Sequence, residues 1–309
     1  MSADPIVVYG PLRGGTTMIR LMLDGHPDLT VPGETDFLFD HLHRDGDGWR
    51  YEVDDLKSSR IFQDSGLAVP HGPNGQAALL DLVGQIAESG GGRPVLMLHR
   101  HLSEAATLLP GVRIIRLLRD PRDVARSAIG MGWAGNVYYG LDTWLETEKN
   151  WRDFIAASPD TPVHVLRYED LVRNPEAELR RICAFLGIGF TEDLLAYPAR
   201  TTYAAPDPKL ASQWKRKLSD REVRLIESRL DPFWQDSGYE PSGLPVHRPD
   251  VSELMMLRMQ NRAAVWKHMV GRYGPMLPVI RGLGRRLRLS GLKQAADKRI
   301  ADIDRSYLK

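Results

Sequence analysis

The stretch Gly10–Thr17 limits most strongly what this chain can fold into. It reads Gly-Pro-Leu-Arg-Gly-Gly-Thr-Thr and joins a β-branched run, Ile6–Tyr9, to an amphipathic helical pattern that extends to about Gly25. Two glycines separated by four residues, followed by one further residue and then a Ser or Thr, have the spacing of a P-loop. A loop of this kind presents backbone N–H groups and a helix N-terminus to an anion. We therefore expect a strand–loop–helix unit that holds a phosphate-like group.

One position in this loop departs from the nucleotide-hydrolysing pattern. Thr16 stands where a P-loop kinase has the lysine that holds the β- and γ-phosphates of ATP. The change disfavours ATP chemistry but leaves the loop able to cradle a phosphate-like group. Arg13 adds a planar guanidinium that can grip an oxyanion through two parallel hydrogen bonds. The sequence thus predicts an anion site of a different kind from that of an ATPase.

The rest of the body alternates short β-branched runs with helical patterns, which is typical of a parallel sheet covered by helices. The predicted fold class is α/β, a P-loop-type three-layer sandwich with a central parallel sheet, plus a C-terminal helical extension. Further strands are expected at Pro94–Leu98, Arg113–Leu118 and Pro162–Leu166, and helices near Gln76–Glu88, Asp123–Gly130, Asp142–Ala157 and Pro175–Leu186. The polar stretch 44–74 is expected to be a loop-like surface insertion or a mobile lid.

The C-terminal part has a different texture. A spacer with three prolines at 241, 245 and 249 suggests a division into a domain of residues 1–245 and a basic helical extension of residues 246–309. Helices are expected from Asp250 to about Val270, over Met276–Arg286 and over Leu292–Tyr307. Residues 251–309 hold 13 Lys/Arg and 4 Asp/Glu, a formal charge of +9, against −8 for residues 1–250.

Three interpretations of this basic tail stay open: a solvated or oligomer-forming surface, an amphipathic helix on a membrane surface, or a contact with an acidic acceptor or nucleic acid. The membrane interpretation depends on leucines interleaved with arginines, namely Leu283, Leu287, Leu289 and Leu292 with Arg281, Arg285, Arg286 and Arg288. Residues 1–250 lack basic patches interleaved with aromatics at nucleic-acid spacing, so no nucleic-acid partner is expected.

Composition places the chain among ordinary soluble proteins, with 42% hydrophobic and 26% charged residues. The single cysteine, Cys183, excludes a disulfide scaffold and a cysteine-ligated cluster. No apolar run reaches the roughly 18 residues of a transmembrane helix, and the first predicted strand leaves no room for a signal peptide. We therefore expect a cytoplasmic protein, with peripheral membrane contact as the alternative that the tail raises.

A second motif follows the strand at 113–118. Arg119 would leave the carboxyl end of that strand, the edge where ligands bind in open α/β sheets. Asp120 and Pro121 suit the start of a helix, and Ser127 lies two turns into it. Arg119 and Ser127 are thus expected at the same edge as the first loop, as ligands of a second anion.

Taken together, the two motifs resemble the sulfotransferase superfamily that uses 3′-phosphoadenosine 5′-phosphosulfate (PAPS). The 5′-phosphosulfate loop of that family is similar to the stretch 12–17, and its 3′-phosphate site is similar to Arg119 with Ser127. The resemblance extends over about residues 5–242 through the stretches 23–27, 167–171 with 174–175, and 213–215. It implies that the donor is held by Arg13, Gly14, Gly15, Thr16, Thr17, Arg119 and Ser127.

The resemblance also implies catalytic residues. The stretch Gly33–Thr35 is similar to the segment with the catalytic glutamate of tyrosylprotein sulfotransferases, and Glu34 follows Arg13 by 21 residues as in that branch. A carboxylate at the mouth of the cleft can take the proton of an acceptor hydroxyl. His101 is the rival base, because His99–Leu102 resembles the Lys-Thr-His-Leu of cytosolic sulfotransferases.

The Lys-Thr of that motif is replaced here by His99 and Arg100, so the cation at the leaving-group oxygen stays open among His99, Arg100 and Arg13. We expect a PAPS-dependent sulfotransferase that modifies a hydroxyl of a small molecule, glycan or lipid, releases 3′-phosphoadenosine 5′-phosphate (PAP) and requires no metal. Catalysis is expected to involve Glu34, Arg13 and His101. A P-loop kinase and a non-catalytic PAP-binding protein are the alternatives.

Overall fold

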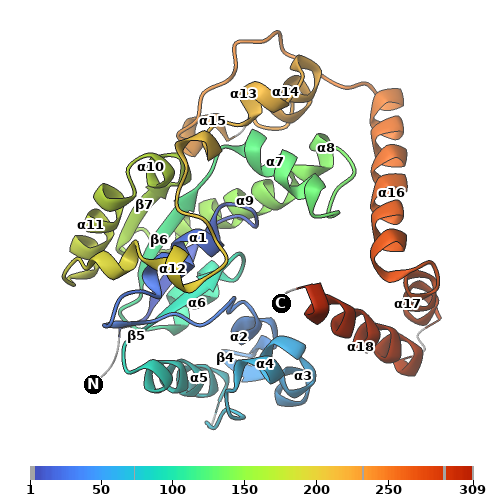
Figure 1. Ribbon diagram of the computed structural model, residues 1–309. Helices are drawn as coiled ribbons and strands as arrows, with labels where there is room; N and C mark the ends of the chain where they lie inside the picture. The colour runs from blue at the N-terminus through green and yellow to red at the C-terminus, as the bar shows by residue number, and fades with distance from the viewer. Residues whose placement is uncertain (1–3, 73, 232, 288–289, 308–309) are drawn as a thin grey trace. The chain divides into compact units, whose positions relative to one another are not determined.

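A computed structural model describes residues 4–72, 74–231, 233–287 and 290–307 (Figure 1). The chain forms two compact units. The first comprises residues 1–124, 143–217 and 232–240, and the second comprises residues 125–142, 218–231 and 241–309. Each unit combines several separate segments of the chain, whereas the sequence predicts a single boundary at residue 245. That boundary stays a prediction.

The first unit is built on a five-stranded parallel sheet with the strand order β2-β5-β1-β6-β7. The strands are β1 (Ile6–Tyr9), β2 (Leu29–Thr30), β5 (Arg93–Leu98), β6 (Arg113–Leu118) and β7 (Val163–Arg167). Strand β1 is central, with Ile6 opposite Val95 of β5 on one side and opposite Arg113 of β6 on the other. The predicted parallel sheet is confirmed, and the bounds of β1 and β6 are those expected from the sequence.

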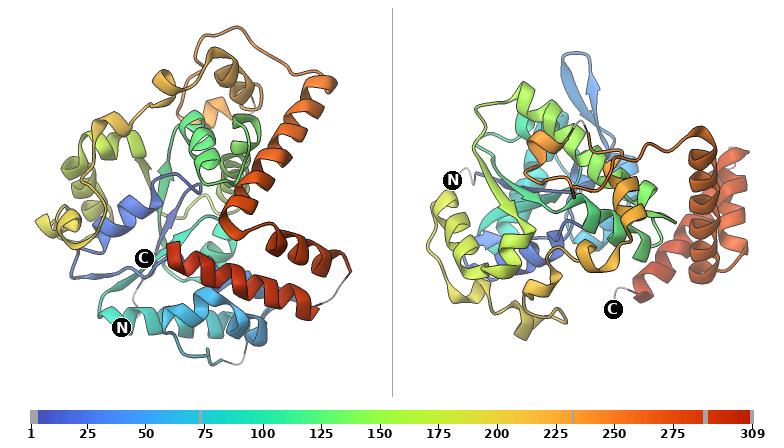
Figure 2. Two further views of the ribbon diagram at one scale, coloured as in Figure 1. Left: turned by 45° about the vertical axis from the view of Figure 1, so that its right-hand side comes forward. Right: turned by 90° about the horizontal axis from the view of Figure 1, so that it is seen from above.

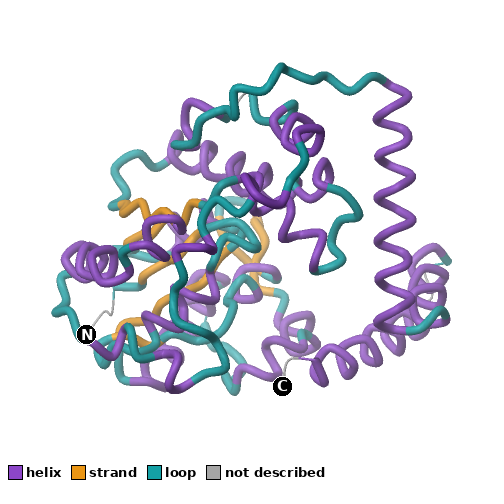
Figure 3. The backbone as a smooth tube through the Cα atoms, turned by 45° about the horizontal axis from the view of Figure 1, so that its top comes forward, coloured by secondary structure: helices purple, strands orange, loops and turns teal. Residues whose placement is uncertain are grey.

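Helices cover both faces of this sheet and make the predicted three layers (Figure 3). Ile6 and Val8 of β1 pack on one face with helices α1 (Thr16–Leu23), α10 (Tyr168–Arg173) and α11 (Pro175–Leu186). Val7 and Tyr9 pack on the other with α2 (Phe37–Asp40), α5 (Gly75–Gly90), α6 (Leu102–Leu108) and α9 (Asp142–Ala157). The strand is buried on both faces, as its continuous apolar run requires.

The stretch 44–74 is not the loop that its polar composition suggested. It contains the hairpin of β3 (Leu42–Asp45) and β4 (Gly48–Tyr51), followed by α3 (Val53–Ser58) and α4 (Arg60–Ser65). These elements bury Tyr51, Leu56 and Phe62 in the core, and the Tyr51 hydroxyl donates a hydrogen bond to the carbonyl of Leu38 over 2.5 Å. The expectation of a loop is wrong because few apolar residues, widely spaced, suffice to anchor elements this short.

The second unit holds the long helix α16 (Val251–Tyr273) and the helices α17 (Met276–Arg286) and α18 (Ser290–Tyr307), orange to red in Figure 2. The helical tail is therefore confirmed, while Arg288 and Leu289 of the predicted leucine–arginine pattern lie outside the described residues. Asp250 caps α16 by accepting a hydrogen bond from the backbone N–H of Glu253. Helices α8 (Val137–Gly140) and α14 (Asp220–Glu227) complete this unit, and Ser219 and Glu222 form a capping box on α14.

Helix α7 (Pro121–Gly130) begins in the first unit and ends in the second. The remaining short elements are the 3₁₀ helices Glu192–Leu194 and Pro208–Leu210 and the helices α12 (Tyr197–Arg200), α13 (Trp214–Lys217) and α15 (Trp234–Ser237). Among the described residues, no helix is both long and apolar enough to cross a membrane.

Candidate active site

Three stretches that the sequence predicts as functional, and Tyr168 of the family-like stretch 167–171, follow directly on four neighbouring parallel strands. Gly10 follows β1, His99 follows β5, Arg119 follows β6 and Tyr168 follows β7. The carboxyl ends of parallel strands meet at one edge of the sheet, and ligands bind there in α/β folds. The topology thus gathers the glycine loop, the histidine-rich stretch and the arginine motif at one edge.

The loop between β1 and α1 has the tight backbone that its glycines permit. The N–H of Gly14 donates to the carbonyl of Pro11 over 2.7 Å, which closes a turn inside the loop. Arg13 has a φ of 70° and Gly15 a φ of 102°, both in the left-handed region. Gly15 is the N-cap of α1, and no side chain caps this helix end. The first turn of α1 contains no acidic residue, so its positive end is not neutralised locally.

Tyr168 connects this loop to Arg119. A Cβ atom on Gly15 would come within 2.3 Å of the Tyr168 ring, so only glycine allows this close approach. The guanidinium of Arg119 lies over the same Tyr168 ring, 4.2 Å from its centre. Its Nη1 donates a hydrogen bond to the carbonyl of Arg13 over 2.8 Å. The structure therefore brings Arg119 to the loop, as the sequence predicts.

The exposed Arg13 and the partly buried Arg119 consequently lie close together at this edge. Burial lowers the pKa of Arg13, and the nearby positive charge of Arg119 lowers it further. The Nε of Arg119 is buried and has no hydrogen-bond partner among the described residues. An unsatisfied buried donor beside two like charges is costly unless an anion completes the site. This donor set fits a phosphate or sulfate group.

Helix α9 and the start of α7 fix the chain around Arg119. The indole N–H of Trp144 donates to the carbonyl of Arg119 over 3.1 Å. Asp120 accepts from the N–H of Arg122 and binds its guanidinium through two hydrogen bonds of 2.8 Å, which confirms its expected place at the helix start. The Arg122 guanidinium stacks 3.8 Å from the Trp214 ring. The segment 213–215, similar to the family, therefore packs against the start of α7.

Two further residues of this region bear on the predicted second anion site. Asp123 accepts the backbone N–H groups of Gln213 and Trp214, and burial raises its pKa to about 6. Ser127 lies half-buried on α7 and belongs to the second compact unit. The pairing of Ser127 with Arg119 around one phosphate therefore stays a prediction.

Glu34 lies at the same edge of the sheet through its backbone. It forms an isolated parallel bridge with Met97, next to the carboxyl end of β5. The following residue, Thr35, is fully buried, and both its N–H and its hydroxyl donate to the Met97 carbonyl over 3.1 Å. Glu34 itself is exposed, and its side chain makes no hydrogen bond or ion pair with the described residues. A rigid anchor thus presents a carboxylate that is available to solvent.

The sequence did not reveal the partner of His99. Its Nδ1 lies 2.9 Å from Oδ2 of Asp36, and its Nε2 lies 3.4 Å from the hydroxyl of Thr16. Oδ1 of Asp36 also accepts the backbone N–H groups of His99 and Arg100. Asp36, His99 and Thr16 are each less than a tenth exposed. An Asp–His pair is therefore buried against the residue that replaces the P-loop lysine.

His101 and Arg100 both bind Asp40. Arg100 holds this carboxylate with two hydrogen bonds, of 2.8 and 2.6 Å, and His101 Nε2 lies 3.0 Å from its Oδ1. Nδ1 of His101 lies 3.8 Å from Glu104. Burial lowers the pKa of His101, but the hydrogen bonds and charges of Asp40 and Glu104 outweigh it and raise the pKa to about 9. The imidazole is consequently protonated near neutral pH.

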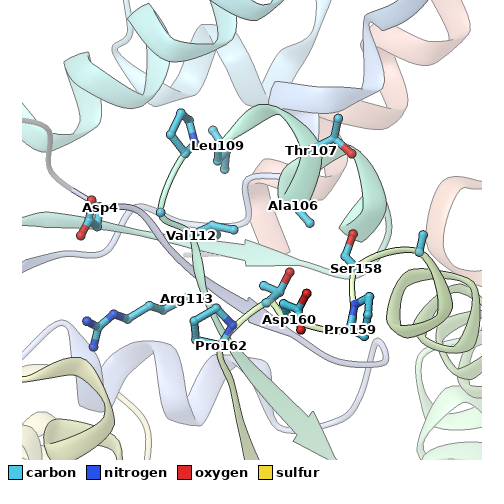
Figure 4. Close-up of a pocket in the computed structure, with 14 residues that line it drawn as sticks. Asp4, Ala106, Thr107, Leu109, Val112, Arg113, Ser158, Pro159, Asp160 and Pro162 are labelled. Atoms are coloured by element: carbon cyan, nitrogen blue, oxygen red, sulfur yellow. The ribbon is translucent and has the colours of Figure 1, made fainter.

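A cavity of about 610 Å³ lies elsewhere in the same unit (Figure 4). It is lined by residues that precede β6 and β7, among them Val112 and Pro162, and by Asp4, which precedes β1. These are the amino-terminal ends of the strands, so the cavity lies at the edge opposite the glycine loop. None of the predicted site residues lines it. Within the described part of the chain, no cluster of three or more His, Cys, Asp or Glu side chains could hold a metal ion.

The chain is similar in sequence and in fold to known sulfotransferases. The family model described as "Sulfotransferase family" matches residues 5–192. A putative protein-tyrosine sulfotransferase of Caenorhabditis briggsae is 25% identical over 272 residues, covering 80% of this chain and 92% of that protein. Protein-tyrosine sulfotransferase 1 of Danio rerio is 26% identical and covers 79% of this chain and 75% of its own length. The sulfotransferase domain from the curacin biosynthetic pathway shares the fold, with a TM-score of 0.51 at 19% identity, covering 83% of this chain and 96% of that one.

Proposed function

The chain belongs to the sulfotransferase family, and from this premise we propose that it transfers the sulfuryl group of PAPS to a hydroxyl of a small molecule, glycan or lipid. The observation that carries the proposal is the contact of Arg119 with the glycine loop. Arg119 donates to the Arg13 carbonyl, and its own buried Nε still lacks a partner in the described structure. A donor molecule with phosphate at both its 5′ and 3′ positions would place one anion at the glycine loop and a second at the buried Nε of Arg119.

The residues of this edge fit PAPS by their chemistry. The uncapped start of α1, with Gly14, Gly15, Thr16 and Thr17, and the guanidinium of Arg13 would hold the 5′-phosphosulfate. Arg119 and Ser127 would hold the 3′-phosphate, the group that distinguishes PAPS from ATP. When bound, PAPS supplies a sulfuryl group whose S–O bond to the phosphate breaks with the electron pair moving to the phosphate oxygen, which leaves PAP.

Glu34 is the base in this proposal. Its carboxylate would take the proton of the acceptor hydroxyl while the acceptor oxygen bonds to sulfur. Its exposure leaves room for an acceptor, and the buried Thr35 fixes its backbone. His101 is the poorer candidate because a pKa of about 9 leaves its imidazole protonated near neutral pH, and a protonated imidazole cannot accept a proton.

His99 is the residue we propose for the leaving-group oxygen. Arg100, which follows His99 after β5, is bound by both oxygens of Asp40. His99 is instead held through Nδ1 by Asp36, which turns its Nε2 toward Thr16 in the loop. A hydrogen bond from this position would stabilise the charge that develops on the leaving oxygen. We expect His99→Lys to retain much more turnover than His99→Gln, because lysine places a positively charged hydrogen-bond donor at this position.

The first test is calorimetric titration with PAP and, separately, with ATP and magnesium. We expect PAP to bind without metal and more tightly than ATP. Arg119→Ala should weaken PAP binding about tenfold to a hundredfold, the effect of losing a charge-assisted hydrogen bond. Arg173→Ala removes an arginine from the exposed end of α10 and serves as the control. ATP binding equal to PAP binding, or an unaffected Arg119 variant, would contradict the PAPS site and return the kinase alternative.

The second test is transfer of radiolabelled sulfate from PAPS to a panel of hydroxyl acceptors: phenols, sugars, lipid headgroups and a tyrosyl peptide. Glu34→Gln should abolish turnover with little change in PAP affinity, whereas His101→Asn should retain turnover. An active Glu34 variant would remove Glu34 from the mechanism. A protein that binds PAP but modifies none of the panel would support the non-catalytic alternative.

A further inference from the structure

The second unit exposes an unusual number of large apolar side chains. In the described residues, ten of the sixteen large hydrophobic side chains that are exposed lie between residues 246 and 287. On α16 they include Val251, Met255, Met259 and Trp266, which are 78%, 62%, 66% and 45% exposed. Such a concentration of exposed apolar side chains in one part of the chain indicates an interaction surface.

These side chains lie on one side of α16. Residues four apart follow one another along a helix face, so Val251, Met255, Met259, Ala263 and Lys267 form one row. Arg258, Arg262 and Trp266 form the neighbouring row. All eight side chains are exposed. The two rows extend over about 24 Å at 1.5 Å per residue.

The opposite side of α16 packs against its own unit. Leu257 is 1% exposed, and its carbonyl accepts a hydrogen bond from Asn136 over 2.8 Å. The side chain of Asn261 accepts from the N–H of Gly135 over 2.6 Å. A Cβ on Gly135 would lie 2.6 Å from the Ala264 methyl. Packing of the unit therefore uses the Leu257 side, and the two rows are left exposed in the described part of the chain.

The charges of these rows are all positive. Arg258, Arg262 and Lys267 lie among the apolar side chains, and Glu253 is the sole acidic residue between positions 251 and 296. The Glu253 carboxylate is already bound by Arg221 over 2.6 Å and lies 2.8 Å from His247 Nε2. A second copy of this chain would bring the same positive rows against each other, which costs energy through like-charge repulsion. Charge complementarity instead favours an anionic partner.

We propose that this face of α16 binds an anionic lipid surface, with Met255, Met259 and Trp266 entering the headgroup region and Arg258, Arg262 and Lys267 contacting lipid phosphates. Apolar residues flanked by Lys and Arg are the pattern of a helix that lies in the plane of a membrane interface. Tryptophan is enriched at that depth, and the long basic side chains can extend to the headgroups. This proposal does not depend on the sulfotransferase activity.

The test is cosedimentation of the full chain with vesicles of phosphatidylcholine alone and of phosphatidylcholine mixed equally with phosphatidylglycerol. We expect binding to the mixed vesicles only, weakening as salt rises. Replacing Arg258, Arg262 and Lys267 by Gln should weaken binding about a hundredfold, since each basic residue near an anionic surface contributes about fivefold. Replacing Lys57, Arg173 and Arg180 by Gln changes the net charge equally in the first unit and should have little effect.

A second pair of variants tests the apolar contribution. Met255, Met259 and Trp266 replaced by Glu should abolish vesicle binding, whereas Ile61, Leu80 and Ile155, exposed in the first unit, replaced by Glu should not. Thermal unfolding confirms that each variant folds. No binding by the wild-type chain, or equal loss in test and control variants, would overturn the proposal. A dimer in light scattering that the α16 substitutions dissociate would also overturn it and assign the face to self-association.

Discussion

The environment of His101 predicts a stability that depends on pH in a defined window. The imidazole lies between Asp40 and Glu104, 3.0 and 3.8 Å from their carboxylate oxygens, and is one quarter exposed. Its pKa is raised from an ordinary 6.5 to about 9. At 1.36 kcal/mol per pH unit this corresponds to about 3 kcal/mol. Solvent screening and the competition of Arg100 for Asp40 reduce the expected contribution to about 2 kcal/mol.

The sign follows from the order of the two pKa values. Below pH 6.5 both the folded and the unfolded chain carry the proton, and the ion pairs contribute fully. Between pH 6.5 and about 9 the unfolded chain releases the proton while the folded chain keeps it, so the contribution falls. Above about pH 9 it is lost. The free energy of unfolding should therefore decrease by about 2 kcal/mol more in the wild type than in His101→Asn between pH 6 and pH 10.

The assay is urea denaturation at a series of pH values. Asparagine suits the replacement because His101 has a φ of 62° and asparagine tolerates the left-handed region. His43→Asn, on the exposed part of the β3–β4 hairpin, is the control. An NMR titration of the His101 imidazole gives its pKa directly. A midpoint near 6.5, or a stability difference between wild type and His101→Asn that does not vary with pH, would refute the reasoning and restore His101 as a candidate base.

Two further predictions concern stability and are measured by urea denaturation. Gly15→Ala should cost at least about 2 kcal/mol, because the new Cβ meets Tyr168 at 2.3 Å with a φ of 102°, whereas Gly33→Ala, whose Cβ would meet nothing within 4 Å, should be nearly neutral; equal effects would contradict the packing of Tyr168 on the loop. Arg116→Met should cost about 3–5 kcal/mol because it breaks a buried ion pair by removing the guanidinium that lies 2.5 Å from Glu148, a carboxylate that is 2% exposed. Arg180→Met breaks an exposed pair and should cost less than about 1 kcal/mol, so a similar loss in both variants would argue against the buried pair.

Local signals in the sequence were sufficient for most of the elements. The bounds of β1, β6, α9 and α11 were predicted as the structure has them, because apolar runs, periodicity and caps are written in neighbouring residues. Stretch 44–74 was misjudged, since the burial of Tyr51 and Phe62 depends on residues far away in the chain. The roles of Glu34, Ser127 and the other site residues stay predictions until the binding and transfer experiments are made.

What the sequence determined by itself was the order of strands, loops and helices and the chemical character of the loop after β1. A glycine spacing and an arginine are sufficient for that, because both act within a few residues. Which distant groups meet depends on the tertiary structure: Tyr168 contacts Gly15 and Arg119, Asp36 binds His99, and Asp40 binds both Arg100 and His101. Parallel strands bring their carboxyl ends together from positions up to 160 residues apart in the chain, and charges and hydrogen bonds depend on the resulting distances rather than on sequence separation.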